Sequence, residues 1–128
     1  MLIAEDNVVN QRLIRLLVER MGHHVTRADN GRLAVEAAQA ERFDVALVDL
    51  HMPEMNGFET ARALRALPGP IPTLAVVSAG VLPPERAEAE AAGFTAFLDK
   101  PVQQEQLDAF FAGLQAAPEA SVAATSER

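Results

Sequence analysis

Short apolar runs alternate with segments of helical spacing along most of the chain, and this alternation restricts the possible folds more than any other feature. The apolar runs cover residues 2–4, 24–28, 45–48, 73–77 and 95–98. Each has the length of a strand buried in a sheet, and the intervals between them leave room for helices. Five strands that alternate with five helices predict a parallel sheet covered by helices on both faces, which is an α/β fold.

The predicted helices cover residues 9–21, 33–40, 57–67, 83–93 and 107–114. In the first of them, five apolar side chains repeat at helical spacing and are expected to form its inward face: Val9, Leu13, Leu16, Leu17 and Met21. Gly22 follows as a C-cap. Pro83 and Pro84 suit the first turn of the fourth helix. The fifth helix has the clearest amphipathic pattern of the chain.

Composition narrows the class of protein. The 128 residues, 49% of them hydrophobic, favour a single globular domain, which we place at residues 1–115. Residues 116–128 are small, polar and aperiodic, and are expected to form a disordered tail or linker. The first strand starts almost at the first residue, which predicts excision from a longer chain. The absence of cysteine excludes disulfides and thiolate metal sites and weakly favours the cytoplasm.

The charge pattern argues against a nucleic-acid surface. The net charge is −7, and the arginines are scattered singly, whereas binding to phosphate backbones needs a clustered basic face. No apolar stretch approaches the roughly 20 residues that span a bilayer, and no secretory signal is recognisable. We therefore expect neither direct nucleic-acid binding nor membrane contact by this domain.

The second predicted strand ends in the ordinary turn Asp29-Asn30-Gly31, whereas the other four end in charged or polar side chains that could form a site. These side chains are Glu5 and Asp6 after the first, Asp49 after the third, Ser78 after the fourth, and Asp99 and Lys100 after the fifth. In an open parallel sheet, ligands bind beyond the carboxyl ends of the strands. Three close carboxylates repel one another unless a cation joins them, and hard oxygen ligands suit Mg²⁺ or Mn²⁺. A lysine and a hydroxyl are suited to the oxygens of a phosphoryl group. The pattern predicts phosphoryl chemistry with a carboxylate nucleophile.

Two of the carboxylates have an alternative role as helix caps. Asp is a favoured N-cap residue, but Asp49 lies too far before the predicted start of the third helix at residues 56–57 to cap it. Asp6 competes with Asn7 as the cap of the first helix, and capping and metal binding are compatible. The pair His23-His24 lies in a turn away from these strand ends and is interpreted as solvated rather than functional.

Four motifs in this order resemble the receiver domains of response regulators in two-component signalling. They are Glu5-Asp6, the D-x-x-M-P-x-M-x-G stretch of residues 49–57, Ser78-Ala79 and Lys100-Pro101. The resemblance extends from residue 2 to about residue 115. It implies a flavodoxin-like doubly wound sheet with strand order 2-1-3-4-5. It also implies a cis peptide bond before Pro101, although only about 5–6% of X–Pro bonds in folded proteins are cis.

The resemblance implies a role for each site residue. Asp49 corresponds to the phosphoacceptor, and Lys100 to the partner of the phosphoryl group. Asp6 would bind Mg²⁺ or Mn²⁺ directly, Glu5 mostly through water, and His51 through its backbone carbonyl.

A second group of residues corresponds to positions that report or limit phosphorylation. Ser78 would hydrogen-bond the phosphoryl group, and Phe97 occupies the aromatic switch position. The signalling surface would be the fourth helix, fifth strand and fifth helix, at residues 85–114. His51 and Gly80 occupy positions that tune phosphoryl lifetime, and because Gly80 has no side chain to shield the group, we expect His51 to dominate.

The implied function is that of a phosphoacceptor switch in a histidine–aspartate phosphorelay, whose partner is a histidine kinase or phosphotransfer domain. It would catalyse its own phosphorylation and slow autodephosphorylation without being a metabolic enzyme. The stretch E-D-N-x-x-N-Q from Glu5 resembles receivers of hybrid histidine kinases; a free-standing regulator is the alternative.

An aspartyl-phosphate phosphatase is disfavoured because such enzymes have D-x-D where this chain has Asp49-Leu50-His51. A flavin or nucleotide binder would need a glycine-rich loop after the first strand, which is missing.

Overall fold

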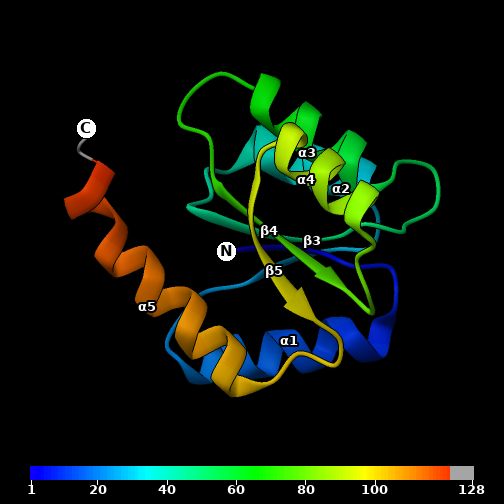
Figure 1. Ribbon diagram of the computed structural model, residues 1–128. Helices are drawn as coiled ribbons and strands as arrows, with labels where there is room; N and C mark the ends of the chain where they lie inside the picture. Colours follow the sequence, from blue (N-terminus) through cyan, green and yellow to red (C-terminus); the bar gives the residue numbers. More distant parts are fainter. Residues whose placement is uncertain (122–128) are drawn as a thin grey trace.

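The structure is a computed structural model that describes the backbone of residues 1–121 and the side chains of residues 1–114. Strands and helices alternate along the chain (Figure 1). Their bounds are β1 Leu2–Ala4, α1 Val8–Arg20, β2 Thr26–Ala28, α2 Gly31–Ala40, β3 Val45–Asp49, α3 Gly57–Ala66, β4 Thr73–Ser78, α4 Pro83–Ala92, β5 Phe94–Asp99 and α5 Gln104–Ser121. The alternation predicted from the sequence is confirmed.

The five strands form one parallel sheet with the order β2-β1-β3-β4-β5. The prediction of a flavodoxin-like sheet is therefore confirmed. The chain runs outward from β1 in both directions, so the order reverses between β1 and β3, and ligands bind at such a reversal in open α/β sheets. Register brings the strand ends level, because Ala4 pairs with Val48, Asp49 with Val77 and Ser78 with Asp99.

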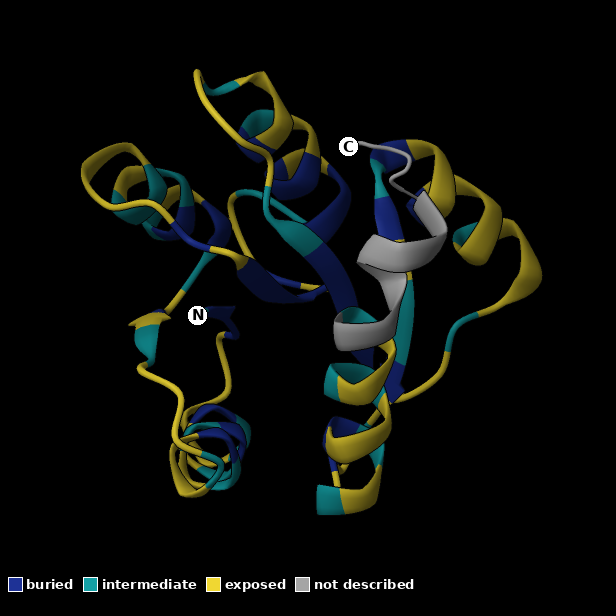
Figure 2. Cartoon of the chain, turned by 90° about the vertical axis from the view of Figure 1, so that its left-hand side faces the viewer, coloured by how far each residue is buried: buried dark blue, intermediate teal, exposed yellow. Residues whose placement is uncertain are grey.

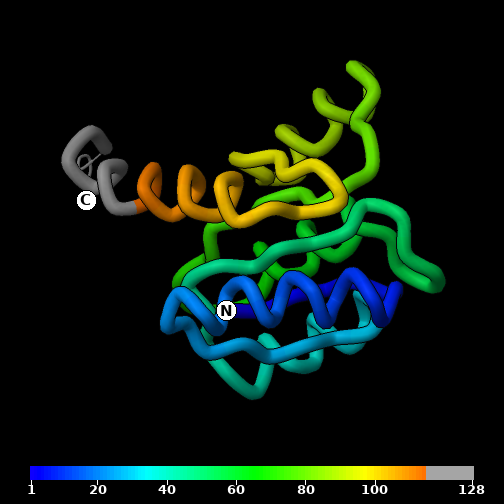
Figure 3. The backbone as a smooth tube through the Cα atoms, turned by 90° about the horizontal axis from the view of Figure 1, so that it is seen from below, coloured from blue at the N-terminus to red at the C-terminus, as the bar shows by residue number. Residues whose placement is uncertain are grey.

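Helices cover both faces of the sheet, and the middle strand explains why. In β3, Ala46 and Val48 contribute to a core beneath α2, α3 and α4, whereas Val45 and Leu47 contribute to a core beneath α1 and α5. A strand buried on both faces must be apolar throughout rather than alternating. Figure 2 shows the buried strands between helices whose outer sides are exposed, and Figure 3 shows α1 and α5 from below.

The inward face predicted for α1 is wrong in part, since Leu17 and Met21 pack against the core but Val9 and Leu16 do not. The buried residues of this helix are Gln11, Ile14 and Val18, whereas Val9 is 75% exposed and Leu16 is 49% exposed. Both sets of residues have helical spacing, and the helix carries more apolar side chains than the core can cover. Docking on the sheet, rather than the apolar pattern, therefore selects the buried face.

Several element bounds also differ from the expected ones. β2 is shorter than residues 24–28, and α2 begins earlier, at Gly31, because Asn30 caps it by accepting a hydrogen bond from the amide of Leu33 at 2.8 Å. α5 runs on to Ser121, so residues 116–121 of the predicted tail have helical backbone. The rest of that predicted tail, residues 122–128, lies outside the described residues. Within the described part of the chain, every helix is too short or too polar to cross a membrane.

Candidate functional site

Three carboxylates meet at the carboxyl ends of β1 and β3. Ligand atoms of Glu5, Asp6 and Asp49 all lie within 4.8 Å of one another. Adjacent parallel strands bring these residues together, because Glu5 and Asp49 each follow one member of the Ala4–Val48 pair. Glu5 and Asp49 are buried, whereas Asp6 is exposed. The cluster predicted from the sequence therefore forms, with one carboxylate open to solvent.

Lys100 brings a positive charge to the same point. Its Nζ lies 2.9 Å from Glu5 Oε1 and 3.2 Å from Asp49 Oδ2, and its side chain is only 17% exposed. The Lys100 amide donates a hydrogen bond to the carbonyl of Ser78 at 2.9 Å, which ties the loop after β5 to the end of β4. The Lys100–Pro101 peptide bond is cis, the isomer that the resemblance implied.

The electrostatics of the site leave an excess of negative charge. Burial raises the pKa of Glu5 to about 7, against the opposing effects of Lys100 and of the Asn7 amide, and the charge of Asp49 raises it further. Burial lowers the pKa of Lys100, but the hydrogen bond with Glu5 and the charge of Asp49 outweigh this effect and hold the pKa above its usual value. One ammonium therefore faces three carboxylates. Clustered hard oxygens with surplus negative charge fit Mg²⁺ or Mn²⁺.

The turn between β3 and α3 is packed directly against the end of β3. The Gly57 amide donates a hydrogen bond to the carbonyl of Leu50 at 2.9 Å. A Cβ at Gly57 would lie 2.6 Å from the Asp49 carbonyl oxygen and 2.6 Å from Leu50 Cα, so only glycine fits without displacing the strand end. The His51 amide donates to Asp49 Oδ1 at 3.1 Å. These contacts fix the backbone on both sides of Asp49.

Asparagines, not the clustered aspartates, cap α1 and α3. Asn7 Oδ1 accepts a hydrogen bond from the amide of Asn10 at 3.0 Å at the start of α1. Asn56 forms a capping box with Glu59 at the start of α3. The alternative roles of Asp6 and Asp49 as helix caps are thereby excluded, so neither carboxylate is engaged at a helix end.

Gln11 supports the β1–α1 loop, a role that the sequence analysis missed. Its Nε2 donates to the carbonyl of Glu5 at 2.9 Å and to Asp29 Oδ1 at 3.1 Å, and its Oε1 accepts from Arg27 Nη1 at 3.3 Å. The side chain is buried and links the ends of β1 and β2. A usable signal was present, because Gln11 is a polar residue at helical spacing from Ile14 and Val18.

Ser78 lines the site at the end of β4, whereas Phe97 lies within β5 and outside the lining of the site cavity. The buried Ser78 Oγ donates to the carbonyl of Gly80 at 3.1 Å and accepts from the Gly80 amide at 3.3 Å. Phe97 is half-buried against the core, and the guanidinium of Arg86 lies 4.1 Å from the centre of its ring. β5 is the edge strand between α4 and α5, which lie on opposite faces of the sheet (Figure 1).

His51 and Gly80 lie on the wall of the cavity that contains the carboxylates. The residues lining it are Glu5, Asp6, Asn7, Asn10, Asp49, His51, Ser78, Ala79, Gly80 and Lys100. The His51 side chain is 64% exposed, and its Nε2 lies 3.4 Å from Glu85 Oε2 on α4. Glu85 was not identified from the sequence.

The exposed His23 stacks on Phe111, with the ring centres 4.4 Å apart.

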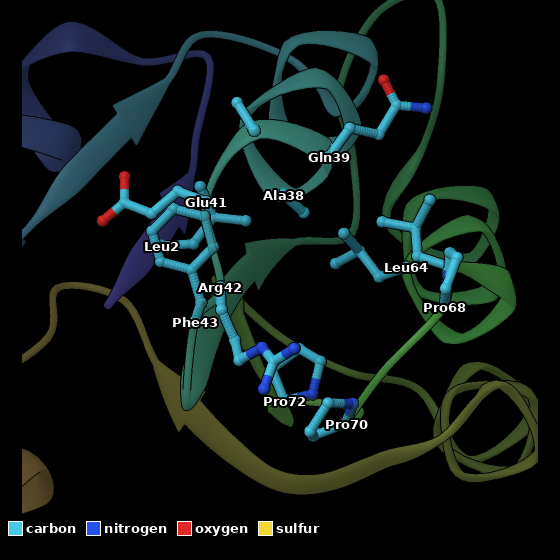
Figure 4. A pocket seen from close by; sticks show the side chains of 12 residues that line it. Leu2, Ala38, Gln39, Glu41, Arg42, Phe43, Leu64, Pro68, Pro70 and Pro72 are labelled. Atoms are coloured by element: carbon cyan, nitrogen blue, oxygen red, sulfur yellow. The ribbon is translucent and has the colours of Figure 1, made fainter.

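Another cavity lies at the opposite edge of the sheet, near the amino ends of the strands (Figure 4). Its wall includes Leu2, Phe43, Leu64 and the prolines at positions 68, 70 and 72. None of the clustered carboxylates lines it. The chemistry indicated by the sequence therefore belongs to the carboxyl edge.

Comparison with known proteins gives one matching family model and several relatives. The model of the response regulator receiver domain matches residues 1–112. The sensory/regulatory protein RpfC of Xanthomonas campestris pv. campestris (strain ATCC 33913) is 36% identical over 105 residues. The signal transduction histidine-protein kinase BarA of Escherichia coli (strain K12) is 34% identical over 105 residues. These matches cover 80% and 81% of this chain but only 14% and 11% of the two relatives.

Solved structures share the fold. The chemotaxis response regulator CheY4 of Vibrio cholerae has a TM-score of 0.80 and 29% identity, covering 87% of this chain and 93% of that one. The receiver domain of a sensor histidine kinase from Pseudomonas aeruginosa PAO1 has a TM-score of 0.77 and 30% identity, covering 85% and 90%. The latter structure has a magnesium ion coordinated in its active-site cleft.

Proposed function

Because the chain belongs to the response regulator receiver domain family, we propose that it accepts a phosphoryl group on Asp49 from a phosphohistidine donor. The observation that carries this proposal is the convergence of Glu5, Asp6 and Asp49 within 4.8 Å, with Lys100 Nζ 3.2 Å from Asp49 Oδ2. A carboxylate at a strand end, beside a cation and two further carboxylates, is arranged for attack on phosphorus.

Transfer forms one bond and breaks one. An oxygen of the Asp49 carboxylate attacks phosphorus, and the P–N bond of the phosphohistidine breaks with its electron pair remaining on the imidazole nitrogen. Lys100 neutralises part of the negative charge that gathers on the transferring group. Glu5, Asp6, Asp49 and the backbone carbonyl of His51 are the groups that would hold Mg²⁺, which when bound supplies positive charge to the phosphoryl oxygens.

Phosphorylation of Asp49 would be transmitted through Ser78 to Phe97 on β5. The Ser78 hydroxyl is bonded to the Gly80 backbone in this structure, and we propose that it exchanges these bonds for one to the phosphoryl group. Phe97, which packs between the core and Arg86, would turn inward as Ser78 moves. The resulting change would alter the surface of α4, β5 and α5, so the domain acts as a two-state switch.

We further propose that the domain works within a hybrid histidine kinase. The E-D-N-x-x-N-Q stretch and the sequence similarity to sensory and kinase proteins support this architecture. The chain spans about one-seventh or less of the length of these curated relatives. Its phosphoryl donor and acceptor are accordingly expected to be histidine-bearing kinase or phosphotransfer domains.

Labelling with a small phosphodonor tests the assignment of Asp49. We expect radiolabelled acetyl phosphate to transfer close to one phosphoryl group per chain when Mg²⁺ is present, and little after chelation of the metal. Asp49→Asn should reduce labelling to background because the nucleophile is lost. Asp44→Asn is the matched control, since it removes an exposed carboxylate just before β3, at the opposite edge of the sheet. Labelling that survives Asp49→Asn would show that another residue accepts the phosphoryl group, and rapid turnover of many phosphoesters would indicate a phosphatase.

A further inference from the structure

The cavity that holds Asp49 has an open side at Gly80. Gly80 lines the cavity, and a Cβ built there would meet no atom within 4 Å. No side chain at this position can therefore limit the approach of water. His51, two residues after Asp49, also lines the cavity. Its side chain, unlike that of Gly80, is large enough to shield part of the cavity from water.

A glutamate on α4 is in contact with the His51 side chain. Glu85 lies in the first turn of α4, which begins three residues after Gly80. Its Oε1 accepts a hydrogen bond from the Leu82 amide at 3.2 Å, which closes the helix start. The same carboxylate places Oε2 3.4 Å from His51 Nε2. The bond to Leu82 holds the carboxylate in one orientation, so His51 meets a preorganised partner.

Burial distinguishes Glu85 from the other glutamates of α4. The Glu85 side chain is 27% exposed, whereas Glu88 and Glu90 are about half exposed and pair with Arg62 and Arg86. Within the described side chains, the His51–Glu85 contact connects the loop after β3 to α4 beside the position where Gly80 leaves the cavity open. The contact thus places the imidazole between the loop after β3 and the first turn of α4.

We propose that Glu85 is a positioning residue that holds the His51 imidazole over the open side of the cavity and thereby slows hydrolysis of the aspartyl phosphate. This inference rests on the proposed role of Asp49 as phosphoacceptor. In hydrolysis, a water oxygen attacks phosphorus, and the P–O bond to Asp49 breaks with its electron pair returning to the carboxylate. The protons of the water leave with inorganic phosphate and the solvent. Covering the approach to phosphorus slows this step without altering the leaving group.

A decay experiment tests the contact. Wild-type protein and variants are labelled with acetyl phosphate in saturating Mg²⁺, the donor is removed, and loss of label is followed over time. Glu85→Ala and His51→Ala should each increase the decay rate by about threefold, which matches what a partly exposed polar contact contributes. The double variant should decay no faster than either single variant, because both substitutions release the same side chain.

Three further variants separate the positioning of His51 by Glu85 from effects on the stability of α4 and on its surface charge. Glu85→Gln keeps a carbonyl oxygen for Leu82 and an amide for His51, so it should restore most of the wild-type decay rate. Glu85→Asp keeps a carboxylate near the helix start but is one methylene too short to reach His51, so it should decay as fast as Glu85→Ala. Glu88→Ala, which removes an exposed α4 charge that pairs with Arg62, should decay like the wild type.

The outcomes distinguish this inference from the proposed function. Unchanged decay in Glu85→Ala, single-variant effects that multiply in the double variant, or equal acceleration in Glu88→Ala would each overturn the role of Glu85 while leaving Asp49 as phosphoacceptor. A wild-type protein that takes up no label would overturn both.

Discussion

At the scale of single residues, Glu5 is the group whose burial and charge are in conflict. Its carboxyl is fully buried beside Asp49, and its main compensation is Lys100 at 2.9 Å. Its pKa is raised to about 7, so in the metal-free protein near neutral pH about half of the molecules carry a proton there. Between pH 4.5 and 7 the folded state binds more protons than the unfolded state at this group. The stability of the metal-free protein that is due to Glu5 is therefore present at low pH and lost as pH rises through about 7.

Magnesium binding should consequently release a proton. The metal needs deprotonated carboxylates, so about half a proton should be released per Mg²⁺ at pH 7, and affinity should rise roughly tenfold from pH 6 to pH 8. The chain has no Trp or Tyr, so titration calorimetry is the suitable measurement, run in two buffers of different ionisation enthalpy. Equal heats in both buffers, after correction for dilution, would show that Glu5 is already ionised.

Glu5→Gln provides the control for that titration. This substitution removes the titrating carboxyl while leaving Asp6 and Asp49 in place. Magnesium binding should weaken but release no proton near pH 7. Continued proton release from the variant would assign the titration to another group.

At the scale of elements, the junction of β3 and α3 decides how Asp49 is presented. The helix starts so close to the strand end that a Cβ at Gly57 would lie 2.6 Å from backbone atoms of residues 49 and 50. The Asn56–Glu59 capping box fixes where α3 begins. The loop therefore cannot shift without moving Asp49 and the His51 carbonyl.

Gly57→Ala should disturb both folding and phosphorylation. The added methyl group must displace backbone rather than a flexible side chain, and such overpacking costs about 1–3 kcal/mol. We expect a lower midpoint in urea unfolding followed by far-ultraviolet circular dichroism, together with slower labelling by acetyl phosphate. Gly113→Ala is the matched control, because its Cβ would meet no atom within 4 Å. Normal labelling kinetics in Gly57→Ala would show that the turn tolerates displacement without moving Asp49.

At the scale of the whole molecule, the two ends of the strands in the sheet carry different features. The carboxyl edge concentrates acidic residues from elements far apart in sequence, whereas the amino edge holds the proline-lined cavity (Figure 4). Because three carboxylates share one small volume, relief of their repulsion should stabilise the entire fold.

Magnesium should therefore raise the melting temperature. At a concentration ten times the dissociation constant, binding to the folded state alone adds about 1.4 kcal/mol, which corresponds to roughly 3–6 °C for a domain of this size. Differential scanning calorimetry at pH 8, with and without Mg²⁺, measures this difference. Asp6→Asn should abolish most of the increment, since it removes the solvent-exposed ligand without disturbing the core. An equal increment in Asp6→Asn would place the stabilising ion elsewhere.

Some features of the fold and of the site could not be predicted from the sequence. The inward face of α1 was predicted correctly only in part, because the exposed Val9 and Leu16 have the same helical spacing as the residues that pack on the core. The contact of Glu85 with His51 joins residues 34 positions apart in sequence, and the position of Glu85 after Pro83-Pro84 indicates a helix start but not a contact with His51. Gln11 was recognisable as a polar residue but not as a link between two strand ends.

Local sequence patterns were enough to predict the alternation of strands and helices and the set of residues that follow the strands. Local periodicity and the burial of β3 on both faces leave few alternatives, and Asp49 at the end of an apolar run stands out because burying a charge is costly. Packing between elements selects which face of α1 is buried, which asparagines cap the helices, and which residue the His51 side chain contacts. These choices depend on distances between elements, and no single stretch of sequence contains those distances.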